Sequence, residues 1–561
     1  MFRVHSSNMS SNEETMKSWF DKKSCLMMLI LNLVFIQYLM AQGPAAGHDD
    51  RLQAYPPAIQ RALGSISVRD LKAHIGFLSS DLLEGRDTPG RGLDIAAAYL
   101  AAEFQRMGLE PGGSNGTYRQ TYSVREYEST HQNTEVSLVQ GDEKVIVTPD
   151  ERILLLFGLT GQSPDVSAPI VFTGFGITAP EKNWDDYKNI DVRGKTVLVF
   201  AGAPWETDLD VVFGYDKLFG KLINAKAHGA AGFIYASPSF GREEPLSEAF
   251  VRAIAHGHNM ILPLETQEPG MSIPAILTSW DVVDQILGMS RVEFQSAEKL
   301  AEKMNVSKKP IWFKIPDLRF QVDVRAVMVD KPVSNIIGLV RGADEKLGDE
   351  FVVFSAHYDH LGISTPVAGD SICNGADDNA SGTAAILELA EAFTSLPEGR
   401  HPRRSLLFLL VSGEEKGLYG SAYFSEHPTV PLSQVIANIN IDMIGRSDSS
   451  RVQVIAPGAE SLYKTVLSVN KQIGLNVLPD QQPQMRLIFL SDQYQFVRND
   501  IPAVFFFTWL HPDYHQPSDE IEKVNFIDCE KITRLVFLTG LEVANSDESP
   551  GWSRPDILIT P

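Results

Sequence analysis

Cysteine and positive charge are both scarce in this chain of 561 residues. Three cysteines are too few for a fold held together by a framework of disulfides. The 49 Lys and Arg residues are outnumbered by 71 Asp and Glu residues, which gives a formal net charge of −22. Such a deficit of basic residues argues against nucleic acid as a partner. No internal repeat is visible, and glycine and proline follow no short period, which excludes a collagen-like fibre.

The rest of the composition is that of an ordinary globular protein. Hydrophobic residues make up 43% of the chain and charged residues 21%. These values exclude a mostly disordered chain and a membrane protein with many spans. At about 150 residues per domain, the length predicts three to four domains, or one large domain with a smaller one.

One long hydrophobic run stands near the N-terminus, at residues 25–41 (CLMMLILNLVFIQYLMA). It follows three lysines and ends in Ala41, a pattern typical of a secretory signal peptide over residues 1–41. An uncleaved signal anchor is the alternative, although the run is short for a span of about 20 residues. We therefore expect a secreted or periplasmic protein that meets the membrane only transiently, through this segment.

The remaining chain divides by pattern. Helical periodicity over Val68–Leu78 and Leu93–Met107 marks an N-terminal region, and Gly108 is placed to end the second helix. Short β-type runs then dominate, and the charged stretch 296–310 is expected to lead out of them. The predicted boundaries are 60–160 for the N-terminal part of the main domain, 165–290 for an inserted β-rich domain, 315–545 for the main part, and 546–561 for a flexible tail.

From residue 335 onward, apolar strands alternate with helices. Strands such as FVVFSAH and RSLLFLLVS are apolar throughout, as expected of a sheet buried on both faces. The pattern predicts an α/β fold with a mixed, mostly parallel sheet covered by helices on both faces.

Five of the connections in this region carry potential metal ligands at strand ends. Ligands in open α/β sheets bind beyond the carboxyl ends of strands, so these side chains are expected to meet at one edge. Single acidic residues at strand ends are usually solvated, but five connections in order are hard to explain as surface chemistry. The side chains are His357 and Asp359, Asp377 and Asp378, Glu414 and Glu415, Asp442, and His515.

Imidazole and carboxylate ligands suit zinc, and a carboxylate can bridge two ions. One plausible grouping has two zinc ions per chain. His357, Asp442 and a bridging Asp378 would hold the first ion, and Glu415, His515 and the same Asp378 would hold the second. Each ion then keeps an open position for water and substrate.

Two further residues are predicted to assist the metal ligands. Glu414 lies beside a ligand without being needed as one, so it could take the proton from the attacking water. Asp359 is two residues from His357 and could accept the second N–H of its imidazole, which would fix the ring's orientation.

The same segments resemble the M28 family of di-zinc peptidases. The resemblance rests on AHYDH, NGADDNASG, SGEEKGLYGS, NIDMIG and YHQPSDE, together with the N-terminal stretch FLSSDLLEGRDTPGRG. It implies a zinc exopeptidase fold, the same ligands and general base, and a cis peptide after Asp378. It also assigns Tyr514 a role in stabilising the tetrahedral intermediate. The inserted segment, with DVRGKTVLVFAG, is similar to a protease-associated (PA) domain.

One position departs from the family pattern. Many members have Ser-Asp-His in a segment facing the substrate, whereas this chain has Gln493 after Ser491 and Asp492. The sequence therefore does not determine which substrate side chain the pocket prefers. Phe496 could either shape that pocket or lie in the core. Other nearby residues are expected to be loop, flanking or capping groups rather than ligands: His256, His258, His360, His511, Asp377, Asp513, Asp519 and Cys373.

The predicted function is that of an exported metallo-aminopeptidase that releases N-terminal residues from peptides. A carboxypeptidase of the same family is the first alternative. A glutaminyl cyclase-like acyltransferase and a non-catalytic binding protein are the others. The sequence does not specify the natural substrate, the oligomeric state, the role of the PA-like domain or the redox state of Cys373 and Cys529.

Overall fold

The computed structural model describes residues 55–128, 134–146, 153–155, 166–205, 218–238, 260–261, 273–290, 292–294, 296–324, 327–397, 399–481 and 487–555. The expected signal segment over 1–41 lies outside these residues, as do His256 and His258. Within the described part of the chain, no helix combines the length and apolar character needed to span a membrane.

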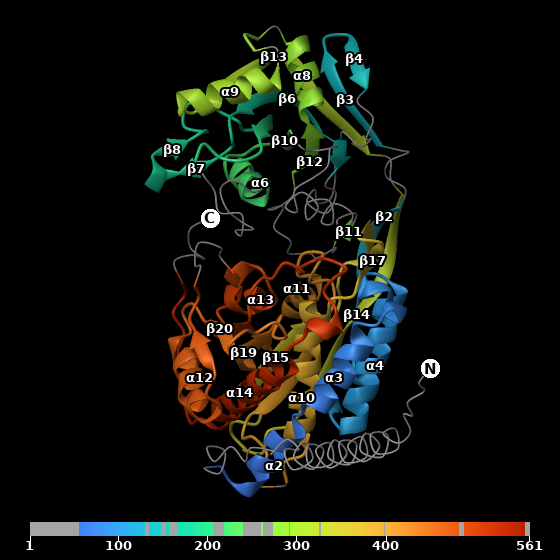
Figure 1. The fold of residues 1–561 in the computed structure, drawn as a ribbon, viewed down its shortest axis with the longest axis vertical. Helices are drawn as coiled ribbons and strands as arrows, with labels where there is room; N and C mark the ends of the chain where they lie inside the picture. Colours follow the sequence, from blue (N-terminus) through green and yellow to red (C-terminus); the bar gives the residue numbers. More distant parts are fainter. Residues whose placement is uncertain are drawn as a thin grey trace, which may run out of the picture. The chain divides into compact units, whose positions relative to one another are not determined.

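A ten-stranded sheet joins the strands that follow residue 335 to β1, β2 and β11, which come from earlier in the chain (Figure 1). Its order is β11-β2-β14-β18-β15-β19-β22-β20-β21, with β1 paired to β14. The strands are β1 (Glu110–Pro111), β2 (Arg119–Glu128), β11 (Met260–Ile261), β14 (Val327–Val340), β15 (Phe351–His357), β18 (Ser405–Val411), β19 (Val435–Ile441), β20 (Arg451–Ile455), β21 (Asn476–Leu478) and β22 (Ala503–Phe507).

The centre of this sheet is parallel and its flanks are antiparallel. Strands β18, β15, β19 and β22 run parallel to one another. β14 and β20 pair antiparallel on either side of them. Every residue of β15, β18 and β22 is buried, which confirms the prediction of a mixed sheet with two covered faces. The parallel strands also bring their carboxyl ends to one edge.

Helices cover both faces of the sheet, and alternate residues of each strand point to opposite faces. Val353 of β15 packs in one cluster with Phe424 of α11 (Tyr419–Glu426) and Phe496 of α13 (Gln493–Arg498). On the other face, Phe354 stacks on Phe408 of β18 and contacts Phe393 of α10 (Gly382–Thr394) with the rings tilted. The helices α4 (Arg91–Met107), α12 (Glu460–Ile473) and α14 (Phe526–Asn545) complete the layers.

The N-terminal helices form where their sequence signals predict. α3 (Val68–Leu78) begins after Ser67, whose hydroxyl accepts the N–H of Asp70 as an N-cap. α4 ends at Gly108, whose φ of +80° suits glycine. α2 (Pro57–Ser65) precedes them, and a short 3-10 segment (Asp81–Arg86) joins α3 to α4.

A second sheet has eight strands in the order β4-β3-β13-β6-β9-β10-β12-β5. Its strands are β3 (Thr134–Gln140), β4 (Glu143–Ile146), β5 (Ile153–Leu155), β6 (Val166–Thr173), β9 (Thr196–Phe200), β10 (Gly232–Ser237), β12 (Ala275–Ser279) and β13 (Trp312–Val324). It therefore extends beyond the expected 165–290 at both ends, because β3, β4, β5 and β13 complete it. The hairpin β7–β8 (Thr178–Ala179 and Trp184–Asp185) belongs to the same region.

Helices α6 (Leu218–Ala227), α8 (Trp280–Met289) and α9 (Ala297–Ser307) accompany this second sheet. The stretch 296–310 was expected to be an exit segment, and that expectation is wrong. Ala297, Leu300 and Met304 recur at helical spacing and are buried in the hydrophobic cluster, while the charged residues occupy the other face of α9.

The C-terminal residues up to 555 also differ from the expected flexible tail. The N–H of Ser553 donates to the carbonyl of Gly458 at 2.9 Å. Arg554 pairs with Asp500 at 3.0 Å, and the indole of Trp552 donates to the same carboxylate. These contacts hold the described part of the tail against the domain of the ten-stranded sheet.

Candidate metal centre

The predicted ligands gather at the carboxyl ends of the parallel strands. His357 is the last residue of β15, and Asp442 directly follows β19. Glu415 follows β18, and His515 lies in the connection after β22. Asp378 comes from the segment before α10, and its peptide bond to Asn379 is cis, as the family resemblance implied.

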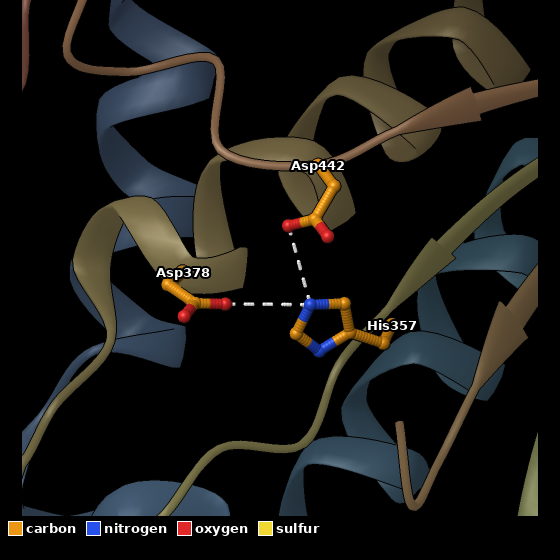
Figure 2. A group of neighbouring side chains, drawn as sticks. All are labelled: His357, Asp378 and Asp442. Carbon is orange, nitrogen blue, oxygen red and sulfur yellow. Dashed lines mark hydrogen bonds and ion pairs between the residues drawn. The ribbon is translucent and has the colours of Figure 1, made fainter. Parts of the chain in front are cut away.

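Three of these residues form what we call the His357 half of the centre (Figure 2). The Nε2 atom of His357 lies 3.2 Å from Oδ1 of Asp442 and 3.3 Å from Oδ1 of Asp378. The imidazole and the two carboxylates therefore point at a common space. His357 and Asp378 are buried, and Asp442 is 7% exposed.

The other oxygen of Asp378 belongs to the His515 half. The Nε2 atom of His515 lies 3.2 Å from Oδ2 of Asp378 and 3.3 Å from Oε2 of Glu415. Asp378 thus presents one carboxylate oxygen to each half. This is the arrangement expected of a carboxylate that bridges two ions.

The spacing of the donor atoms fits zinc. Two ligand atoms placed at 2.0–2.1 Å around a tetrahedral ion lie about 3.3 Å apart, and the four separations in the two halves are 3.2 or 3.3 Å. Among the described residues, every group of three or more His, Cys, Asp or Glu side chains close enough to share an ion draws on this edge of the sheet.

Electrostatics also favour a cation here. Burial tends to lower the pKa of His515, but Glu415 and Asp378 outweigh it and raise that pKa to about 10. Burial tends to raise the pKa of Asp378, yet the surrounding histidines hold it well below its usual range. Several buried carboxylates at such close range need compensating positive charge, which bound metal ions would supply.

Asp359 contacts both the metal ligand His357 and the proposed proton acceptor Glu414. The Nδ1 atom of His357 lies 3.2 Å from the backbone carbonyl of Asp359 and 3.7 Å from its carboxylate. The backbone N–H of Glu414 donates to that same carboxylate at 3.3 Å. Asp359 therefore fixes both the ring of His357 and the backbone of Glu414. Burial raises the pKa of the Glu414 carboxyl well above its ordinary value.

Tyr514 lies flat against the imidazole of His515. The two ring centroids are 3.7 Å apart, with an angle of 24° between the rings. Burial, followed by the nearby Asp378 and Glu415, raises the pKa of the Tyr514 hydroxyl well above its usual value. This hydroxyl therefore stays protonated and can act as a hydrogen-bond donor at neutral pH.

Comparisons with known proteins bear on the same region. Residues 335–539 match the family described as peptidase family M28. This chain carries an M28 peptidase domain. Over 228 residues it is 28% identical to aminopeptidase YwaD of Bacillus subtilis, a match that covers 38% of this chain and 46% of YwaD. It is also 34% identical over 150 residues to a probable zinc metalloprotease of Leptosphaeria maculans, covering 25% of this chain and 33% of that protein.

The chain spans less than half the length of these curated relatives. Among solved structures, the aminopeptidase from Aneurinibacillus sp. strain AM-1 superposes with a TM-score of 0.53 at 18% identity. That match covers 88% of this chain and 97% of the other. At this level of identity the likeness is one of fold.

Gln493 of the M28 domain does not face a substrate pocket, which corrects the expectation from sequence. Its side chain is fully buried and accepts a hydrogen bond from Nδ2 of Asn440 at 2.8 Å. Asn440 also donates to Oγ of Ser491, which donates to Oδ2 of Asp442 at 2.8 Å. Gln493 is thus the far end of a chain of neutral groups behind the His357 half. Phe496 is a core aromatic, 2% exposed.

Asp519 does not cap either of the helical segments that follow it, whose N-caps are Glu520 and Asn525. Its buried carboxylate accepts the backbone N–H groups of Asp377 and Asp378, at 3.0 and 3.1 Å. Asp377 in turn accepts the N–H of Gly445 and contacts His511 at 3.2 Å. These contacts tie the segment of the bridging carboxylate to the loop that carries His515.

Arg86 is a supporting residue that sequence reasoning missed. It lies in the polar segment EGRDTPGRG, yet it is 1% exposed. Its guanidinium donates to the backbone carbonyls of Leu78, Tyr358, Asn374 and Gly375. It therefore joins the N-terminal helices to the connections that carry His357 and Asp378. All four acceptors are backbone atoms, so no local sequence signal marks this role.

Proposed function

We propose that this protein is a zinc-dependent aminopeptidase that binds two zinc ions in its M28 domain. One observation carries the proposal: two imidazole–carboxylate groups share the two oxygens of Asp378, and the four imidazole–carboxylate separations match ligands on one tetrahedral ion in each half. The relatives named aminopeptidase and zinc metalloprotease agree with it.

The ligands divide as the two halves do. His357 and Asp442 would hold one ion, His515 and Glu415 the other, and Asp378 both. Bound zinc would supply a water of lowered pKa and would polarise the scissile carbonyl. The side chains of the protein would then position the peptide and transfer the proton of the attacking water to the departing amine.

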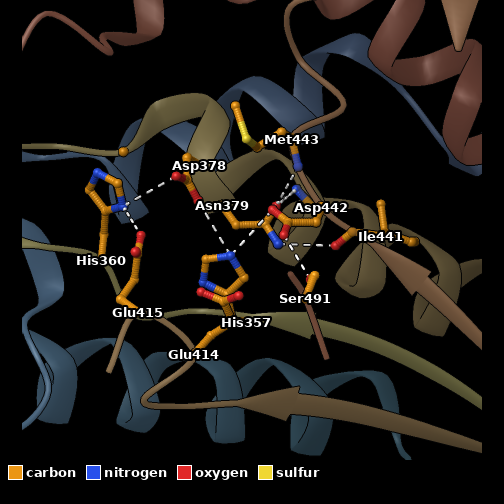
Figure 3. Close-up of polar contacts among 12 residues, drawn as sticks. His357, His360, Asp378, Asn379, Glu414, Glu415, Ile441, Asp442, Met443 and Ser491 are labelled. Carbon is orange, nitrogen blue, oxygen red and sulfur yellow. Dashed lines mark hydrogen bonds and ion pairs between the residues drawn. The ribbon is translucent and has the colours of Figure 1, made fainter. Parts of the chain in front are cut away.

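Glu414 is the proton carrier in this mechanism. One of its carboxylate oxygens lies within 4.8 Å of a ring nitrogen of His357 and of a carboxylate oxygen of Glu415. Glu414 therefore adjoins a ligand of each half (Figure 3). We assign it the proton of the attacking water, which it would pass to the departing amine. Asp359 holds the backbone of Glu414 in place, and the protonated hydroxyl of Tyr514 would stabilise charge on the carbonyl oxygen.

Hydrolysis of matched substrates tests the proposal. The full chain would be incubated with aminoacyl 4-nitroanilides that carry either a free or an acetylated α-amine. Cleavage of the free-amine substrates alone, abolished by a chelator and restored by zinc, is the expected result. Equal cleavage of acetylated substrates would contradict an aminopeptidase. Conversion of an N-terminal Gln to pyroglutamate would instead indicate a cyclase.

Export is a separate proposal that rests on the pattern of residues 1–41. The N-terminal sequence of the protein recovered outside its producing cells would test it. A mature chain beginning near Gln42 is expected. Retention of the intact chain in the cytoplasm would contradict export without affecting the proposed activity.

A further inference from the structure

Two of the carboxylate ligands are each held from outside the metal centre by their second oxygen. Oδ1 of Asp442 faces His357, while Oδ2 accepts a hydrogen bond from Ser491. Oε2 of Glu415 faces His515, while Oε1 lies 2.7 Å from Nδ1 of His360 (Figure 3). His360 therefore contacts the second oxygen of Glu415 in the same way that Ser491 contacts the second oxygen of Asp442.

The imidazole of His360 has a fixed position. It is fully buried, and its backbone N–H donates to the carbonyl of Arg86 at 3.2 Å. One side of the ring lies against Gly375, where an added Cβ would come within 2.6 Å of the ring. Gly375 also has a φ of +56°, which favours glycine. The surroundings thus leave this ring little room to turn.

We propose that His360 is a positioning residue that aims Glu415 at the ion of the His515 half. The proposal rests on the proposed zinc site. The Nδ1–H group of His360 donates to Oε1 of Glu415, which turns Oε2 toward His515 and Asp378. The Nδ1 atom of His360 lies 2.7 Å from Glu415 and 3.9 Å from Asp378, so these three side chains are close enough to share an ion. His515 fits the ion of this half better, because its Nε2 lies 3.2 and 3.3 Å from the same two carboxylates, which is the spacing of two ligands on one tetrahedral ion. Nε2 has no hydrogen-bond partner among the described residues, which favours the tautomer with hydrogen on Nδ1.

Zinc affinity of single-half variants tests this role without using activity. His357→Ala disables one half and His515→Ala the other, so each leaves one ion to titrate against a chromophoric chelator. His360→Leu and His360→Asn would be added to each background. Leucine removes the donor, whereas asparagine places its amide nitrogen close to the position of Nδ1.

In the His357→Ala background, His360→Leu should weaken the remaining zinc site about 10–100-fold, and His360→Asn should restore most of the loss. In the His515→Ala background, both substitutions should leave affinity within about two-fold. Equal weakening in both backgrounds, or an Asn variant as weak as the Leu variant, would overturn the proposal. Far-UV circular dichroism and thermal unfolding of the metal-free variants would verify that each one folds.

The same titration separates this proposal from the proposed function. A wild-type chain that binds two zinc ions, with neither site affected by His360→Leu, contradicts the role of His360 and leaves the peptidase intact. A wild-type chain that binds no zinc contradicts both. Ser491→Ala is the matched control, since it should weaken zinc only in the His515→Ala background.

Discussion

The His357 half and the His515 half share Asp378 but are held in place by different kinds of contact. The ligands of the His357 half stand at the ends of adjacent parallel strands, β15 and β19. Buried neutral groups lie behind them, such as Ser491 and Asn440. A ligand that ends a central strand inherits its position from the sheet. The backbone carbonyl of Asp359, at 3.2 Å from Nδ1 of His357, and the uncharged Ser491 then complete the orientation of the two ligands.

The ligands of the His515 half come from connections instead. His515 lies eight residues beyond β22 and has a φ of +58°. Its loop is held by Asp513, which pairs with Arg446 at 2.8 Å and with Lys523. Glu415 is oriented by the imidazole of His360. Where the sheet does not position a ligand, charged and ionisable side chains do so.

The largest expected effect is common to both halves and tests whether they act as one site. Glu414→Gln keeps the size of the side chain but removes the proton acceptor. We expect kcat to fall by about 10²–10⁴-fold with both zinc ions retained. Kinetics and zinc content would be measured together, with the exposed Glu345→Gln as a control. Wild-type kcat in Glu414→Gln would remove this residue from the mechanism.

The next effect should be confined to the His357 half. Ser491→Ala removes the hydroxyl that holds Oδ2 of Asp442. Zinc affinity of that half should fall about 10–100-fold, with the His515 half unchanged. Chelator titration of the single-half variants would measure this. Ser425→Ala, which removes a hydroxyl that donates to the carbonyl of Ala422 within α11, should have no effect on zinc.

A smaller effect should appear only in the His515 half. Asp513→Asn keeps the shape of the side chain and removes its charge. Partly exposed ion pairs contribute about 0.2–1 kcal/mol each, so the zinc affinity of this half should fall by no more than about five-fold per pair. Raising the salt concentration should weaken the wild-type His515 half in the same way, because salt screens these pairs. An equal response to salt in the two halves would remove the distinction between them.

The last effect lies outside the metal centre, at a buried acid that no candidate metal site includes. Burial raises the pKa of Glu388 on α10 to about 8, and Oε2 accepts the N–H of Ser67. The folded state therefore keeps a proton that the unfolded chain releases near pH 4.3, and stability should decline as pH rises from about 4.3 to 8.

Glu388→Gln should remove that decline. Relative to the wild type, this variant should gain up to about 4 kcal/mol in unfolding free energy at pH 8.5 compared with pH 5. Chemical denaturation of the metal-free proteins at the two pH values would measure the difference. Parallel curves for the two proteins would show that Glu388 is already ionised in the folded state.

The ligands were predictable because strand ends can be read from apolar runs, and parallel strands bring those ends together. His357, Asp378, Glu415, Asp442 and His515 all lie at the predicted edge. The helix α3, which has clear periodicity and an N-cap serine, also matches its predicted bounds.

The supporting contacts were not predictable, because they join residues far apart in the chain. Arg86 reaches backbone carbonyls some 270–290 residues away, and Gln493 is buried by the packing of α13 on the sheet. The α9 segment is a different case. Its apolar residues did show helical spacing, but the charges on the other face suggested an exit segment.

Crystallographic anomalous scattering at the zinc edge would test the central claim most directly. We predict two peaks per chain, one about 2.0–2.1 Å from Nε2 of His357 and the other at the same distance from Nε2 of His515, with Asp378 contacting both. In the same map, Nδ1 of His360 should contact Glu415 and no metal. A single peak, or zinc bound directly to His360, would contradict this account of the two halves.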